Sequence, residues 1–366
     1  MRTRVRTNIL NVRQYVPGKP IEEVQREQGL KEVIKLASNE NCLGPSPKAI
    51  AAIKKNLDNV NRYPDASSFY LRRRISKLLG VEEGSLIFGN GSDEIIGMAI
   101  RTFVEPGDEV VIAKPTFLIY EIMSQIQNAR IRSVPLAKGL KHDLAAMKAV
   151  VTPNTKIVFI ANPDNPTGTY VASNELENFL AGLPEKTIIF LDEAYFEFAD
   201  YSYKDYPNGL DYLSERPGVI VARSFSKAYG LAGLRIGYGI SSPEIIGYME
   251  RTREPFNVNL LAQVAAAAAV DDKVFLKKTL AHVESQKDLL YAAFRKMGLD
   301  YVESATNFVL VNVKEDCARV FNSLLKRGVI VRDMKAWGLD TYIRVTVGTR
   351  TENRKFIEAL KQVIKS

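Results

Sequence analysis

Between residues 85 and 240, the sequence alternates short apolar runs with longer amphipathic segments, and this rhythm is its strongest constraint on the fold. The apolar runs have the length of buried strands, whereas the segments between them have the length of helices. Such alternation is typical of an α/β domain around a mainly parallel sheet, with ligand groups on the loops beyond the strand ends. The expected strands are 86–88, 109–113, 156–161, 187–191, 219–222 and 234–240.

The pattern changes after residue 258. Residues 260–297 predict one or two long helices, because few helix-breaking residues interrupt them. The remaining segment mixes predicted strands at 306–313, 328–332 and 341–347 with helices, which indicates a smaller α+β unit. We therefore predict an N-terminal arm with the start of the small domain at 1–40, a large domain at 41–258 and a small C-terminal domain at 259–366.

Composition excludes several functional classes. With 46% hydrophobic and 25% charged residues, the sequence is typical of a soluble globular protein, and no apolar run is long enough to span a membrane. No apolar block follows the N-terminal arginines, so we expect a cytoplasmic protein without a secretory signal. Basic residues exceed acidic ones by 50 to 42 but are spread along the chain, which favours small anionic substrates over nucleic acid. Two cysteines and two histidines are too few for a multi-cysteine zinc site, and we expect no metal.

Four short segments that follow predicted strands carry the candidate chemistry. The first, FGNGSDE, places Ser92, Asp93 and Glu94 at the start of a helix, where free backbone amides form an anion site. In the second, NPDNPTG, two prolines and a glycine hold Asn165 in a rigid loop, which suits a side-chain amide that binds a fixed ligand atom. Each segment alone is also compatible with an ordinary strand-to-helix connection.

The third and fourth segments contain ionisable groups. Asp192 and Glu193 follow the apolar run IIFL, and Tyr195 lies two residues after Glu193. They could bind a metal, although no third ligand with suitable spacing is evident, or an acid there could stabilise a buried cation. The fourth segment, SFSKAYGLAGLR, combines two serines with Lys227 and, eight positions later, Arg235. A lysine among small residues behind a buried strand loses hydration, which lowers its pKa and makes it a nucleophile for carbonyl groups.

Together these segments resemble the fold-type I pyridoxal-phosphate-dependent aminotransferases, and within them the histidinol-phosphate aminotransferase group. The resemblance covers nearly the whole chain and extends to the motifs YVPGKP, LASNEN, RYPD, REPFNVN and IRVTVG. It implies a large domain whose mainly parallel sheet is sandwiched by helices, a smaller α+β domain, and pyridoxal 5'-phosphate as the cofactor.

The resemblance also implies a role for each matching residue. Lys227 would attach the cofactor covalently and act as the general base, while Asp192 would keep the pyridine nitrogen protonated. Asn165 and Tyr195 would hydrogen-bond the phenolic oxygen of the ring. The other residues expected around the cofactor are Ser92, Asp93, Glu94, Phe117, Ser224, Ser226 and Arg235, with Tyr63 contributed across the interface of a homodimer. Phe117 stands where relatives usually have a stacking tyrosine, so stacking is kept and a hydroxyl is lost.

Substrate recognition would fall to Tyr15, Arg332 and Arg344. Two guanidinium groups can hold a phosphate dianion and, in the other half-reaction, the carboxylate of glutamate, although Arg332 could instead form a surface ion pair. The resemblance implies transamination between histidinol phosphate and 2-oxoglutarate, giving imidazole acetol phosphate and glutamate in histidine biosynthesis. Alternatives are an aromatic amino-acid aminotransferase or a threonine-phosphate decarboxylase of the same family. A transcription regulator with this fold would need a DNA-binding domain, for which the residues before Leu36 are too few.

Overall fold

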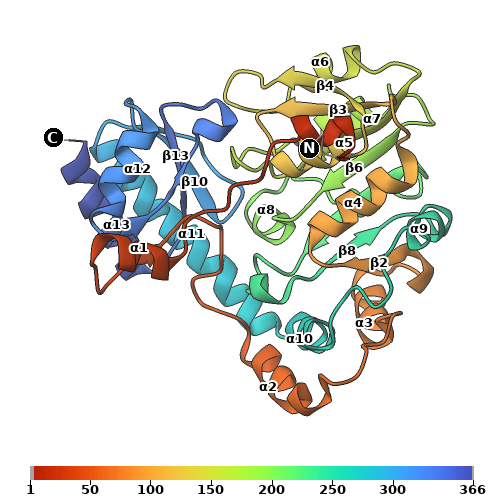
Figure 1. Cartoon of the computed structure of the whole chain (residues 1–366), viewed down its shortest axis with the longest axis horizontal. Helices are drawn as coiled ribbons and strands as arrows, with labels where there is room; N and C mark the ends of the chain where they lie inside the picture. Colours follow the sequence, from red (N-terminus) through yellow and green to blue (C-terminus); the bar gives the residue numbers. More distant parts are fainter. Residues whose placement is uncertain (1–3, 365–366) are drawn as a thin grey trace.

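The computed structural model describes residues 4–364, which form a larger and a smaller lobe (Figure 1). The larger lobe is built on a seven-stranded sheet. In chain order its strands are β2 (Leu86–Gly89), β3 (Glu109–Lys114), β4 (Arg130–Pro135), β5 (Thr155–Ala161), β6 (Ile188–Asp192), β7 (Val219–Ser224) and β8 (Gly237–Ile240). Their order in the sheet is β2-β8-β7-β6-β5-β3-β4. The strand β8 runs antiparallel to both of its neighbours, and the other neighbouring strands are parallel.

Helices cover both faces of this sheet. One face packs against α4 (Ser92–Phe103), α5 (Leu118–Ile126) and α9 (Pro243–Glu250). The opposite face packs against α2 (Pro47–Asn56), α3 (Phe69–Leu79), α6 (Leu144–Ala149), α7 (Ser173–Leu180) and α10 (Leu260–Val270). Along β6, Ile188 and Phe190 join the first core, whereas Ile189 and Leu191 join the second. A strand that is buried on both faces needs apolar side chains at every position, which explains the continuous apolar runs in the sequence.

The smaller lobe has a sheet of its own, in the order β12-β13-β10-β9. Its strands are β9 (Asp300–Tyr301), β10 (Phe308–Asn312), β12 (Arg332–Asp333) and β13 (Tyr342–Thr346), all paired antiparallel. Three helices pack against this sheet: α11 (Lys273–Lys296), α12 (Cys317–Leu325) and α13 (Arg350–Val363). Phe294, Phe308 and Phe356 lie in the shared core, so the lobe does not depend on the larger sheet for its hydrophobic interior.

The N-terminal arm connects the two lobes. Near its start, the Asn8 side chain donates to the carbonyl oxygens of Gln125 and Ile126 at the end of α5, at 2.9 and 3.0 Å. The arm then crosses to α1 (Ile21–Gln28), as the red trace in Figure 1 shows. Beyond α1, β1 (Ile34–Lys35) pairs in parallel with β11 (Val329–Ile330). The segment around β1 therefore belongs to the smaller lobe, together with β11 from the C-terminal part of the chain.

Most of the longer elements agree with the sequence prediction, and the clearest difference lies at the edge of the large sheet. The edge strand β4 was missed because its charged residues Arg130 and Arg132 break the apolar pattern that marks the inner strands. Helix α10 packs on α2, and its alanines lie in the core of the larger lobe, which favours a division between α10 and α11. The boundaries at 41 and 259 stay predictions. Between residues 4 and 364, no helix combines the length and hydrophobicity needed to cross a bilayer, and both cysteines are free.

Candidate active site

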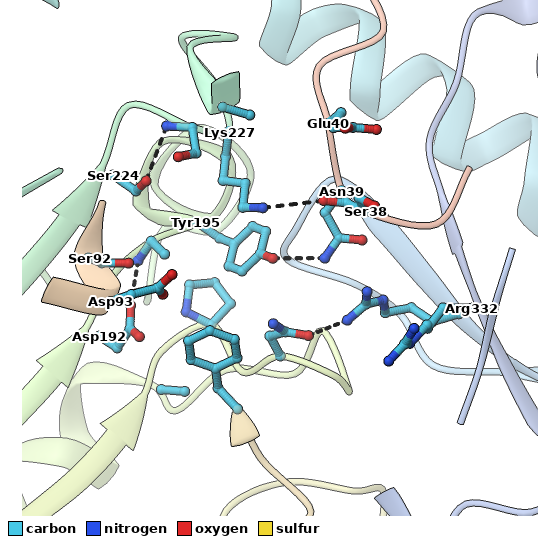
Figure 2. A pocket seen from close by; sticks show the side chains of 18 of the residues that line it. Ser38, Asn39, Glu40, Ser92, Asp93, Asp192, Tyr195, Ser224, Lys227 and Arg332 are labelled. Atoms are coloured by element: carbon cyan, nitrogen blue, oxygen red, sulfur yellow. Dashed lines mark hydrogen bonds between the residues drawn. The ribbon is translucent and has the colours of Figure 1, made fainter. Parts of the chain in front are cut away.

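A cavity at the carboxyl ends of β5, β6 and β7 gathers most of the predicted functional residues, and it lies where the two lobes face each other (Figure 2). Strand ends in parallel sheets are the usual position for ligand sites, because loops from adjacent strands meet there. The predicted residues that line the cavity are Tyr15, Ser92, Asp93, Phe117, Asn165, Asp192, Tyr195, Ser224, Ser226, Lys227, Arg235, Arg332 and Arg344. Glu94 and Tyr63 do not line it.

Asp192 is the last residue of β6 and is 5% exposed. Its carboxylate accepts hydrogen bonds from the Tyr120 hydroxyl at 2.6 Å and from the Ala194 amide at 3.0 Å. Burial raises the pKa of Asp192 to about 6, while the Tyr120 hydrogen bond opposes that shift. A buried carboxylate with two fixed donors is held in one orientation, and a cation in the cavity would restore its ordinary ionisation.

Lys227 follows β7 by three residues, and its amine enters the same cavity. Its Nζ atom lies 3.4 Å from the carbonyl oxygen of Ser38 and 5.6 Å from the centre of the Tyr195 ring (Figure 2). Burial lowers the pKa of Lys227 to about 8, and the charge of Arg344 lowers it further. An amine with this pKa is unprotonated often enough near neutral pH to attack a carbonyl or to accept a proton.

Tyr195 and Asn165 both line the cavity, and each has a hydrogen-bond partner that orients its side chain. The Tyr195 hydroxyl accepts a hydrogen bond from the Asn39 side chain at 2.8 Å (Figure 2). Burial raises the pKa of Tyr195 to about 12, so its hydroxyl remains a hydrogen-bond donor at neutral pH. The Asn165 side-chain oxygen accepts from Arg344, which leaves its amide group as a donor.

Ser92, Asp93, Ser224, Ser226 and Arg235, which the sequence assigned to a phosphate cradle, all line the cavity, and their binding of an anion stays a prediction. Helix α4 begins at Ser92, so the unpaired amides of its first turn face the cavity. Arg235 reaches across the helix terminus to Asp93 at 3.1 Å and to the Ser226 hydroxyl at 3.4 Å. The preceding residue, Gly91, has a φ of +79°, and a Cβ atom there would lie 2.5 Å from the Arg235 guanidinium. Glycine is therefore needed for the arginine to approach the helix terminus.

Arg332 and Arg344 form the opposite side of the cavity. They are directly paired across β12 and β13, which places two like charges side by side. Such a pair is destabilising unless an anion lies between the charges. Within residues 4–364, neither guanidinium forms an ion pair with a carboxylate: Arg344 binds Asn165 and the Ala37 carbonyl oxygen, and Arg332 binds the Val16 carbonyl oxygen at 2.7 Å. The surface ion pair considered for Arg332 is not present in the described chain.

Two predicted residues lie outside the cavity. The Glu94 carboxylate accepts from the Asn90 amide at 2.5 Å and from the Asn257 side chain at 2.9 Å, so it stabilises the turn before α4. Tyr63 is 83% exposed and stacks on Phe256 with ring centres 4.7 Å apart. Its assignment to the site of a second subunit stays a prediction.

The two neighbouring carboxylates at the end of β6 have separate partners. Glu193 pairs with Arg223 at 2.8 Å and accepts from the Gly209 amide, away from the cavity that Asp192 lines. The two acids therefore do not share a ligand. In the part of the chain that is described, no three His, Cys, Asp or Glu side chains are grouped in a way that could hold a metal ion.

Sequence reasoning missed three residues that the fold brings to this site: Tyr120, Asn39 and Trp337. Tyr120 lies 72 positions from Asp192, and Asn39 lies 156 positions from Tyr195. Asn39 belongs to the LASNEN motif, which indicated that this segment lies near the site. Nothing in the sequence indicated that the Asn39 side chain binds the Tyr195 hydroxyl. The other two residues lie in segments that show only an ordinary amphipathic pattern.

The donors and charges of the cavity fit pyridoxal 5'-phosphate. The buried acid Asp192 would serve as the counter-ion of a ring nitrogen, the buried amine of Lys227 lies in the same cavity, and the helix terminus with Arg235 would hold the phosphate. Phe117 also lines the cavity and provides an apolar surface for a ring. Four cations, Lys227, Arg235, Arg332 and Arg344, outnumber the three acids Glu40, Asp93 and Asp192, as an anionic ligand requires.

Comparison with known proteins agrees with this geometry. A family model for aminotransferase class I and II matches residues 31–360. The histidinol-phosphate aminotransferase of Moorella thermoacetica is 49% identical over 360 residues, which cover 98% of this chain and 92% of that protein. Histidinol-phosphate aminotransferase 2 of Carboxydothermus hydrogenoformans is 46% identical over 360 residues, covering 98% and 99% of the two chains. The crystal structure of the Sinorhizobium meliloti histidinol-phosphate aminotransferase in complex with pyridoxal-5'-phosphate superposes with a TM-score of 0.91 at 29% identity, covering 99% of this chain and 98% of that one. The predicted architecture is therefore confirmed.

Proposed function

Because the chain belongs to the class I and II aminotransferase family, we propose that it transfers an amino group between histidinol phosphate and 2-oxoglutarate, with pyridoxal 5'-phosphate as its cofactor. The products are imidazole acetol phosphate and glutamate, and the reaction is a step of histidine biosynthesis. One observation carries the proposal: the cavity joins a buried lysine and a buried acid to two arginines that have no carboxylate partner among residues 4–364.

The cofactor supplies a conjugated ring that accepts the electron pair left on the substrate α-carbon when its proton departs. Asp192 provides the negative charge that keeps the ring nitrogen protonated, and Tyr120 holds this carboxylate in place. Asn165 and Tyr195 donate hydrogen bonds to the oxygen substituent of the ring. The Lys227 amine takes the proton from the α-carbon, which its lowered pKa permits at neutral pH.

Arg332 and Arg344 serve both half-reactions in this proposal. A phosphate dianion and a carboxylate each accept two parallel hydrogen bonds from a guanidinium group. Binding either anion also removes the repulsion between the two arginines, which are directly opposite across β12 and β13. Tyr15, which lines the same side of the cavity from the N-terminal arm, limits the access of water to the bound anion.

The functional unit that we propose is a homodimer in the cytoplasm. Exposed apolar residues are frequent from the end of α2 to the first turn of α3, where Val60 is 61% exposed, Tyr63 83% and Tyr70 79%. A monomer rarely leaves such a patch open to water. In the dimer, Tyr63 reaches the phosphate cradle of the partner subunit. A Tyr63→Phe variant tests this contact. We expect the cofactor to dissociate faster from the variant, while sedimentation shows an unchanged dimer. An unchanged dissociation rate would contradict the contact.

A panel of amino donors tests the reaction. The cofactor-loaded protein is mixed with 2-oxoglutarate and with histidinol phosphate, phenylalanine or threonine phosphate, while its visible spectrum and the release of carbon dioxide are followed. We expect turnover of histidinol phosphate to exceed that of phenylalanine by at least about 100-fold in kcat/KM, since a phosphate adds charge-assisted hydrogen bonds. Preference for phenylalanine would identify an aromatic aminotransferase, and carbon dioxide from threonine phosphate would identify a decarboxylase.

A further inference from the structure

Trp337 is the only tryptophan in the sequence, and it lines the cavity together with Phe117 and Arg332. It ends the short helix η6 (Lys335–Trp337) between β12 and β13 and is 8% exposed. We propose that Trp337 is a positioning residue for the anionic end of the substrate, because its ring holds Arg332 while its indole N–H joins the smaller lobe to the cofactor side of the cavity. The inference rests on the proposed function in one respect, namely that the substrate carries a phosphate.

The ring of Trp337 orients Arg332 without neutralising it. The Arg332 guanidinium carbon lies 5.2 Å from the ring centre, within the range of a cation–π interaction. A carboxylate partner would fix the same guanidinium more strongly but would compete with the substrate anion for its N–H groups. The π face attracts the cation and leaves those N–H groups available. Arg332 also donates a hydrogen bond to the Val16 carbonyl oxygen, so the ring and the arm together set its orientation.

The indole N–H connects this arrangement to the other lobe. It donates to the carbonyl oxygen of Thr116 at 3.0 Å, and Thr116 directly precedes Phe117. The Thr116 hydroxyl donates in turn to Asp164 at 2.7 Å, in the loop that carries Asn165. Trp337 is therefore fixed from both lobes. Trp337 therefore helps to set the distance between Arg332 and the cofactor side of the cavity, and this distance favours substrates whose amine and anion have the matching separation.

Two substitutions separate the contributions of the ring and of the N–H group. Trp337→Phe keeps an aromatic face for Arg332 and loses the hydrogen bond to Thr116, whereas Trp337→Leu loses both. We expect the KM for histidinol phosphate to rise about tenfold in Trp337→Leu and about threefold in Trp337→Phe, with kcat within about twofold of the wild type. The KM for histidinol, which lacks the phosphate, serves as the matched control and stays within about twofold. Equal losses for both substrates, or a fall in kcat at unchanged KM, would overturn the proposal.

Fluorescence tests the same contact without turnover. Because the chain has one tryptophan, emission excited at wavelengths that tyrosine does not absorb reports on Trp337 alone in the cofactor-loaded wild type. Titration with inorganic phosphate should change this emission saturably, and the change should disappear in Arg332→Gln. If the Trp337 emission does not change during the titration with phosphate, the proposal is overturned, even if Trp337→Leu fails to fold. If the wild type turns over phenylalanine and not histidinol phosphate, the proposed function fails, whereas a saturable response to phosphate would still support Trp337 as the residue that positions Arg332.

Discussion

The two sides of the cavity are assembled in different ways. On the cofactor side, Asp192 ends β6, Ser224 ends β7 and Lys227 follows three residues later, so one sheet positions all three. On the anion side, Tyr15 comes from the N-terminal arm, and Arg332 and Arg344 come from the small sheet of the other lobe. The chemistry therefore depends on the internal order of one domain, while recognition of the anion depends on how two lobes and the arm pack together.

The difference has consequences for how the activity can vary. Changes on the cofactor side alter groups that act on the reacting atoms, and we expect them to lower kcat. Changes on the anion side alter binding of a distant group, and we expect most of their effect in KM. Changes to Lys227, to the acids at the end of β6, to Arg344 and to the pH should show this separation between effects on kcat and effects on KM, in decreasing order of expected size.

Replacing the reactive amine should have the largest effect. Lys227→Ala removes both the proposed covalent attachment point and the proposed general base, so we expect kcat to fall by at least about 10⁴-fold. The measurement is single-turnover transamination followed by visible absorbance. Lys277→Ala, which removes an exposed lysine on α11, is the matched control and should retain full activity. Residual turnover above one hundredth of the wild type would show that another group moves the proton.

Substitutions of the adjacent acids Asp192 and Glu193, at the end of β6, should affect different properties: the first the catalytic rate and the second the stability of the fold. Asp192→Asn keeps the shape of the side chain and its contact with Tyr120 but removes the charge opposite the ring nitrogen, so we expect kcat to fall about 10²- to 10³-fold. Glu193→Gln leaves Arg223 buried without its counter-charge and should destabilise the fold by about 3–5 kcal/mol.

Kinetics and urea unfolding of both variants check the contrast between the acids. Asp192→Asn should unfold at nearly the wild-type urea concentration, and properly folded Glu193→Gln should retain most of its kcat. A loss of kcat in Glu193→Gln that equals the loss in Asp192→Asn would contradict separate roles for the two carboxylates.

A substitution on the anion side of the cavity should mainly raise KM. Arg344→Lys retains the charge but cannot form two parallel hydrogen bonds, so we expect the KM for histidinol phosphate to rise about 10- to 100-fold at nearly constant kcat. The KM for glutamate should rise as well, because the same guanidinium serves both half-reactions. Steady-state kinetics with each substrate varied in turn provide the measurement. A large fall in kcat without a change in KM would contradict the claim that the anion side acts in binding and the cofactor side in catalysis.

The pH dependence of cofactor capture should give the smallest effect. Burial lowers the pKa of Lys227 to about 8, and only the unprotonated amine attacks the aldehyde. Below pH 8 the amine is protonated, so the capture rate by cofactor-free protein should fall about tenfold per pH unit, and above pH 8 it should level off. Stopped-flow absorbance between pH 6 and pH 9.5 gives the profile. A rate that is still rising tenfold per pH unit at pH 9.5 would indicate an amine with an ordinary pKa.

The cofactor side could be predicted from the sequence because each of its groups lies in a short motif next to a buried strand. The apolar runs of β5, β6 and β7 place their carboxyl ends at one edge of the sheet, which brings Asn165, Asp192 and Lys227 together whatever the other lobe does. Their predicted convergence agrees with the cavity, while their individual roles stay predictions.

The contacts that orient these groups could not be predicted. The Tyr120 hydrogen bond to Asp192 and the Asn39 hydrogen bond to Tyr195 join residues that are distant in the sequence. Trp337 lies beside Arg332 because of the turn between β12 and β13 and the packing of two lobes, which local patterns do not encode. The polar edge strand β4 was missed for a related reason, since its pairing with β3 depends on the sheet rather than on its own composition.

Two buried lysines allow the most direct test of the central claim. Burial lowers the pKa of both Lys227 and Lys287, but Lys227 lines the cavity, whereas the Lys287 amine donates to the Ser304 carbonyl oxygen at 2.6 Å and pairs with Glu284. Borohydride reduction of the cofactor-loaded protein, followed by peptide mass analysis, should find the cofactor on Lys227 and leave Lys287 unmodified. A label on any other lysine, or no label in a protein that binds the cofactor, would contradict the account.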